Sequence, residues 1–135
     1  IGDKGQVLAK MGADIDGGFV KTRNAEGELV AMIGAGLNGN GLVGISNAEG
    51  KVLAKMGADY KGDGTVATYN AEGETVASMG SDSEGHGRVG TFNAEGNLLV
   101  SMDADSEGYG YVETLNAEGA GVAAIGIDSE GDGSV

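Results

Sequence analysis

The tetrapeptide Asn-Ala-Glu-Gly occurs five times in this chain, and each copy begins 23 residues after the one before it. The copies begin at Asn24, Asn47, Asn70, Asn93 and Asn116. A fixed period of this length is the signature of a repeat protein, in which each repeat forms one structural element and stacks on its neighbours. We therefore predict a single array of six repeats, with boundaries at 2–23, 24–46, 47–69, 70–92, 93–115 and 116–135.

Each repeat contains a first segment in which apolar residues alternate with other residues. In the first three repeats the alternating residues are Val7, Ala9, Met11 and Ala13; Leu29, Ala31, Ile33 and Ala35; and Val52, Ala54, Met56 and Ala58. A period of two is typical of a β-strand, so each set is predicted to share one face. The opposite face is expected to carry Leu8, Val30, Leu53, Val76, Leu99 and Val122. We therefore expect that face to be partly covered as well.

The second segment of each repeat is shorter and is centred on a valine, namely Val20, Val43, Val66, Val89, Val112 or Val135. Two residues later the chain carries Thr22, Ile45, Thr68, Thr91 or Thr114. In a strand these side chains point the same way as the valine. Because Ile45 replaces threonine in one repeat, we expect this column to pack in an interior, where β-branched side chains stack. A flat threonine ladder that binds ice or sugar is the alternative.

The two connections in each repeat are predicted to be turns. In Asn-Ala-Glu-Gly, asparagine can accept hydrogen bonds from the backbone that follows it, and glycine supplies the positive φ that closes such turns. The other connection is typified by Ser83-Glu84-Gly85-His86-Gly87, which places two glycines one residue apart. This spacing indicates a sharp corner or the close approach of another chain.

Composition limits the interior that these strands can build. The chain has 135 residues with 28 glycines, two phenylalanines and no tryptophan, so it has few large side chains to fill a globular core. It has no proline, which excludes collagen. We predict an all-β, repetitive fibrous β-helix, and specifically a trimeric triple-stranded β-helix, because intertwining adds buried surface and pairs the strand edges. A monomeric β-solenoid is the alternative.

The net charge of −13 disfavours binding to nucleic acid and to anionic lipid surfaces. No apolar run is long enough to span a bilayer, so we expect no membrane insertion. The charge is uneven, because residues 70–135 hold 13 acidic residues and only Arg88 as a basic residue. A cationic partner would therefore prefer the C-terminal half. The chain has no cysteine, which excludes disulfides and thiol chemistry.

The sequence offers no shared catalytic site. The single histidine, His86, occupies a turn position where the other repeats carry Asn40, Asp63, Tyr109 or Asp132. Asp82 and Ser83 are close to His86 in sequence, but a catalytic triad is defined by geometry and not by adjacency. We therefore predict that the protein is not an enzyme, with no catalytic residue, no metal ligand and no bound cofactor.

Calcium binding is the alternative that the turns leave open. Residues Asp128–Gly133 alternate oxygen-bearing side chains in a glycine loop, as in the first half of a calcium-binding loop. The distal bidentate glutamate is missing, and the equivalent turn at 37–41 carries no carboxylate. We therefore expect a solvated polar turn at this position.

With its turn, its apolar strand and its Gly-x-Gly corner, the repeat resembles the glycine-rich repeats of phage tail fibres and spikes and of bacterial surface fibre proteins. The resemblance implies a homotrimeric or filamentous β-structured shaft, extracellular on a cell surface or virion, that spaces or displays a tip or adhesion domain. Ile1 is not a natural start, so we expect the chain to be part of a longer fibre. An acidic repeat module that binds calcium or another ligand is the alternative function.

Overall fold

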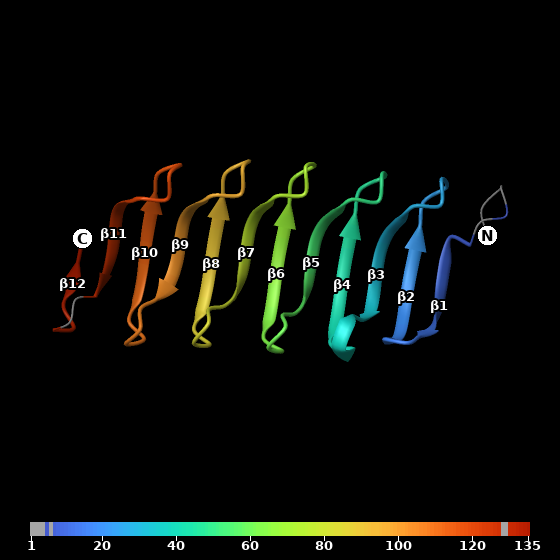
Figure 1. Cartoon of the computed structure of the whole chain (residues 1–135), viewed down its shortest axis with the longest axis horizontal. Coiled ribbons are helices and arrows are strands. Elements are labelled where there is room, and N and C mark those ends of the chain that lie inside the picture. The colour runs from blue at the N-terminus through green and yellow to red at the C-terminus, as the bar shows by residue number, and fades with distance from the viewer. Residues whose placement is uncertain (1–4, 6, 128–129) are drawn as a thin grey trace. The chain divides into compact units, whose positions relative to one another are not determined.

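The computed structural model of this chain describes residue 5, residues 7–127 and residues 130–135. These residues form twelve β-strands and one short 3-10 turn (Figure 1). The prediction of an all-β, repetitive fold is therefore confirmed. Within the described ranges, no helix is long and apolar enough to cross a membrane.

The chain divides into two parts, Ile1–Gly73 and Glu74–Val135. The N-terminal part contains β1 (Ala9–Asp14), β2 (Gly17–Arg23), β3 (Leu29–Ala35), η1 (Leu37–Gly39), β4 (Gly41–Ser46), β5 (Val52–Ala58) and β6 (Gly64–Tyr69). The C-terminal part contains β7 (Thr75–Ser81), β8 (Gly87–Phe92), β9 (Leu98–Ala104), β10 (Gly110–Leu115), β11 (Gly121–Ile127) and β12 (Gly133–Ser134).

Within each part, every strand pairs antiparallel with the next strand in the sequence, so each part is a β-meander. Figure 1 shows the strands of each part following one another in a single layer. Short turns make this arrangement natural, because antiparallel neighbours need only a few connecting residues. One 23-residue repeat supplies two neighbouring strands; β5 and β6, for example, both lie within 47–69.

The Asn-Ala-Glu-Gly segments form the predicted tight turns. In the turn that begins at Asn47, the N–H of Gly50 donates to the Asn47 carbonyl at 3.0 Å, and Gly50 has a φ of 80°. The Asn47 side-chain oxygen accepts from the N–H groups of Glu49 (3.1 Å) and Lys51 (2.9 Å). The asparagine thus satisfies the turn backbone, and glycine adopts the left-handed conformation without steric cost.

A β-bulge follows most of these turns and changes which residues share a face. Between β2 and β3, Thr22 is opposite Ala31 and Arg23 is opposite Leu29, so the register leaves Val30 without a partner. The same shift skips Leu53, Leu99 and Val122 in later repeats. An inserted residue moves the residues before it to the other face. The prediction that Leu29 and Val52 share a face with the later alternating residues of their strands is therefore wrong.

One face of each sheet, which we call the apolar face, is built from three rows of residues that the strand register places side by side. The middle row is Met11, Val20, Ile33, Val43, Met56 and Val66 in the N-terminal part, and Met79, Val89, Met102, Val112 and Ile125 in the C-terminal part. The row nearer the Asn-Ala-Glu-Gly turns is Ala9, Thr22, Ala31, Ile45, Ala54 and Thr68, and Ala77, Thr91, Val100, Thr114 and Ala123. The row nearer the other turns is Ala13, Gly18, Ala35, Gly41, Ala58 and Gly64, and Ser81, Gly87, Ala104, Gly110, Ile127 and Gly133. None of these residues is ionisable.

The opposite face, which we call the charged face, carries ionisable side chains among apolar residues and glycines. The ionisable residues include Lys10, Lys21 and Lys55 in the N-terminal part, and Arg88, Asp103 and Glu113 in the C-terminal part. Of the residues whose side chains the structure describes, only Phe19, Gly90 and Ser101 are buried, and all three lie on this face. The few buried residues of each sheet therefore lie on its charged face.

The apolar face is open to solvent within a single chain. The methionines and isoleucines of its middle row expose between 52% and 82% of their surface. Thr68, Thr91 and Thr114 are exposed as well. The interior that we expected around the threonine column is therefore not formed within one chain.

Candidate functional site

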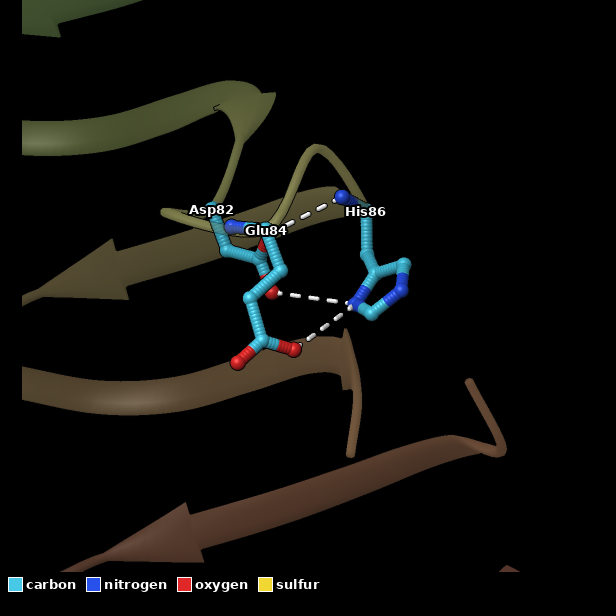
Figure 2. A group of neighbouring side chains, drawn as sticks. All are labelled: Asp82, Glu84 and His86. Carbon is cyan, nitrogen blue, oxygen red and sulfur yellow. Dashed lines mark hydrogen bonds and ion pairs between the residues drawn. The ribbon is translucent and has the colours of Figure 1, made fainter. Parts of the chain in front are cut away.

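The turn between β7 and β8 holds the one group of side chains in the described residues that could ligate a metal ion. It consists of the carboxylates of Asp82 and Glu84 and the imidazole of His86 (Figure 2). Each residue offers one ligand atom, and these atoms lie within 4.8 Å of one another. The sequence had singled out Asp82 and His86, and the structure brings them together.

The Asp82 carboxylate accepts hydrogen bonds from the backbone of its own turn. Its Oδ1 accepts hydrogen bonds from the N–H groups of Glu84 (2.8 Å) and His86 (2.9 Å). Its Oδ2 lies 3.3 Å from Nδ1 of His86, and the Glu84 Oε2 lies 3.9 Å from the same nitrogen. Figure 2 shows both carboxylates directed at this side of the imidazole ring. The arrangement is a closed turn whose histidine contacts two acidic side chains.

The pKa of Asp82 reflects these contacts. Partial desolvation acts to raise the pKa, but the backbone N–H groups of His86 and Glu84, together with the charge and hydrogen bond of the His86 ring, outweigh it and hold the pKa below its ordinary value of 3.8. A lowered pKa stabilises the folded state above the unfolded pKa, and this contribution is lost as the pH falls through the folded pKa. The Asp82 carboxylate therefore supports the turn at neutral pH and ceases to do so only in acid.

The same turn chemistry recurs where no histidine is present. Asp59 accepts from the N–H groups of Lys61 (2.8 Å) and Asp63 (3.0 Å). Asp105 accepts from the N–H groups of Glu107 and Tyr109, both at 2.9 Å. The aspartate is thus explained by the turn, a glutamate stands at the position of Glu84 in the turn at Asp105 as well, and His86 is the member of the cluster that distinguishes this repeat from those two. We assign no metal to the cluster.

Other turn residues that the sequence had weighed have a structural role. Asp63 and Tyr109 occupy the position of His86 and donate their N–H groups to the turn aspartate as His86 does. The predicted alternative of a calcium loop at 128–133 includes Asp128 and Ser129, which lie outside the described residues. In the Gly-x-Gly corners, a Cβ added to the second glycine, as at Gly64 or Gly87, would meet no atom within 4 Å. No atom of the chain itself therefore crowds these two glycines, and the approach of another chain stays a prediction.

The sequence did not anticipate a hollow on the charged face of the N-terminal part. It has a volume of about 270 Å³ and is lined by Leu29, Ala31, Met32, Leu42, Gly44, Ser46, Val52 and Lys55. The bulges create it, because they turn Leu29 and Val52 toward this face. The lining is apolar except for Ser46 and Lys55, so it lacks the converging polar groups of a catalytic pocket.

The chain matches no known protein-family model, and no curated protein matches it significantly.

Proposed function

We propose that this protein is a structural, non-catalytic shaft that works by self-association. In this proposal it is an extracellular fibre of a cell surface or virion, and its repeats space or display a tip or adhesion domain. The observation that carries the proposal is the open apolar face, whose middle-row methionines and isoleucines are more than half exposed in a single chain.

A sheet of one layer cannot bury enough apolar surface by itself. Stable architectures pack the hydrophobic face of a sheet against another layer, and contiguous exposed apolar patches mark interaction surfaces. The middle row of each apolar face continues from strand to strand, for example from Val43 to Met56 to Val66. An interface that continues along the repeats in this way favours a rod made of several copies over a compact domain.

The assembly that we propose is a homotrimer in which three chains wind or pack into one β-structured shaft. Each 23-residue repeat contributes two strands, and neighbouring strands are separated by about 4.8 Å, so one repeat would lengthen the shaft by about 9.5 Å. In repeat proteins, stability is the sum of contacts between neighbouring repeats. Adding repeats would therefore lengthen the shaft without any new type of contact.

A second candidate is an acidic repeat module that binds calcium or a cationic ligand, and the Asp82, Glu84 and His86 cluster favours it. Against it, Oδ1 of Asp82 already accepts two backbone hydrogen bonds. Titration calorimetry with calcium separates the two functions. If the protein is a shaft without metal sites, the calcium titration will give no saturable heat. If it is a calcium-binding module, the titration will give saturable heat, and adding a chelator will lower the melting temperature.

The mass of the protein in solution tests the proposed function. One chain has a mass of 13.3 kDa. Light scattering should give three times this mass, or a larger value if trimers join into filaments. A mass of one chain, with circular dichroism showing folded β-structure, would contradict the proposal, because it would mean that the open face is stable in water.

A further inference from the structure

We propose that three copies of this chain meet through their apolar faces, which form the inner walls of a triangular prism with the middle row nearest the axis. The inference rests on the proposed function and deepens it by naming the interface. The partner is two further copies of this chain, and the charged face of each copy stays toward solvent.

The charge of the chain leaves few surfaces on which identical copies can meet. Each copy carries a net charge of −13, so copies repel one another wherever their acidic groups come close. The three rows of the apolar face hold no ionisable residue. Burying this face desolvates no charged side chain, whereas burying the opposite face would desolvate Lys55 or Glu113.

Side-chain size across the apolar face fits three walls better than two. The middle row is methionine, isoleucine and valine, whereas the flanking rows are mainly alanine, glycine, serine and threonine, with Ile45, Val100 and Ile127 as the larger members. In a triangular prism the walls converge at the edges, so the flanking positions have the least room. Strands of six or seven residues are roughly 20–24 Å long, which puts the centre of each wall about 6–7 Å from the axis; methionine and isoleucine side chains can span this distance, and valine side chains fill most of it.

A face-to-face pair of sheets would fit this size pattern poorly. Two packed sheets stay about 10 Å apart across their whole width. Flanking rows of alanine and glycine, such as Ala58 with Gly64, would leave empty space there, and protein interiors do not tolerate such voids well. The small flanking residues therefore favour a trimer over a dimer.

The accessible surface area of a single chain is large enough for assembly to bury a sizeable part of it. One chain exposes 8551 Å². A folded monomer of this mass exposes about 6,500 Å², so roughly 2,000 Å² per chain is in excess. This excess is of the size that permanent assemblies bury.

The charged face, by contrast, is largely satisfied within the chain. Arg88 Nε lies 3.0 Å from Oδ2 of Asp103, and the Ser101 hydroxyl donates to Oε1 of Glu113 at 3.3 Å. Phe19 is packed between Gly12 and Gly34 and is only 8% exposed. The charged face is therefore covered more completely within one chain than the apolar face is.

Cysteine substitution tests the assignment, because the natural chain has no cysteine. Val66→Cys places a thiol in the middle row of β6, and Ala67→Cys places one on the charged face of the same strand. In the prism, the three copies of residue 66 surround the axis at one level. In this geometry the Cα atoms of the three copies of residue 66 are roughly 10–12 Å apart, beyond the reach of a disulfide, so protection from alkylation is the readout. Alkylation of the Val66→Cys thiol should be roughly ten-fold or more slower than alkylation of the Ala67→Cys thiol, since access controls thiol reactivity.

The outcomes separate the interface from the proposed function. A trimer in which only Ala67→Cys is protected from alkylation, in which both variants are protected equally, or in which neither is protected would overturn the assignment of the face while leaving the shaft intact. A dimeric mass would overturn the prism. A mass of one chain for the unsubstituted protein would overturn both proposals.

Discussion

The two faces of each sheet differ in how far a single chain completes them. The charged face has fewer apolar residues, yet it holds every buried residue of the described side chains, including Phe19 and Ser101. The apolar face has continuous rows of valine, methionine and isoleucine, and the chain leaves them open. The exposed apolar residues thus form a continuous patch that follows the strand register, unlike the isolated exposed apolar residues that are normal on protein surfaces.

Glycine accounts for much of this difference. On the charged face, glycines make room for large neighbours: a Cβ on Gly34 would lie 2.9 Å from the Phe19 Cβ, and one on Gly126 would lie 3.0 Å from the Tyr111 Cβ. On the apolar face, a Cβ on Gly41 would meet nothing within 4 Å. The first set of glycines serves packing inside the chain, and the second leaves the apolar face flat, which suits the contact between copies that we propose.

The largest expected effect comes from placing a charge on one face or the other of the same strand. Val66→Asp should abolish the trimer, because it would put three carboxylates around one axis, and burying unpaired charges costs several kcal/mol. Ala67→Asp is the matched control, since residue 67 is opposite Lys55 on the charged face. Light scattering should show trimers for the control only. Equal masses for the two variants would remove the distinction between the faces.

A smaller effect is expected from adding one methyl group to the charged face. A Cβ on Gly34 would lie 2.7 Å from the Gly18 carbonyl oxygen, so Gly34→Ala should destabilise the protein by about 1–3 kcal/mol through overpacking. Gly44→Ala, on the same face of β4, meets only Met32 at 3.7 Å. It should be neutral or stabilising by up to about 1 kcal/mol, because alanine restricts the unfolded chain. Urea unfolding followed by circular dichroism measures both. If Gly34→Ala and Gly44→Ala unfold at the same urea concentration, Phe19 is not closely packed against Gly34.

The turns and the positions of the strands were predictable from the sequence, because both follow from local chemistry. The asparagine and glycine of each Asn-Ala-Glu-Gly segment determine the turn, and the alternation that follows it identifies the strand. The all-β class and the two strands per repeat follow from the same features.

The bulges were not predictable from a period of two. Val30 and Leu53 are apolar, so they fit an uninterrupted strand that is buried on both faces as well as they fit an inserted residue. Only the pairing of Thr22 with Ala31 and of Arg23 with Leu29 shows the shift. Because of that shift, the hollow next to Leu29 could not be seen in the sequence either.

The candidate site shows the same division between local and non-local information. Asp82 and His86 are four residues apart, so their proximity could be expected from the turn that they share. The packing of Phe19 between Gly12 and Gly34 depends on the pairing of β1, β2 and β3, which no local pattern specifies. Phe19 is accordingly the one large apolar residue that is buried among the described residues, and the sequence analysis did not single it out.

The smallest expected effect is the loss of the ion pair on the charged face. The Asp103 side chain is 8% exposed, whereas that of Arg88 is 44% exposed, so solvent screens the pair in part. Arg88→Ala should therefore cost only about 0.5–1 kcal/mol, and less in high salt. Asp103→Ala should cost more, because Oδ1 of Asp103 also accepts the N–H of Ala104 at 2.9 Å. Urea unfolding at low and high salt measures both changes. Neither variant should alter the mass in solution. A loss of trimers in either variant would mean that the charged face contributes to the interface, which would contradict the assignment of the interface to the apolar face alone.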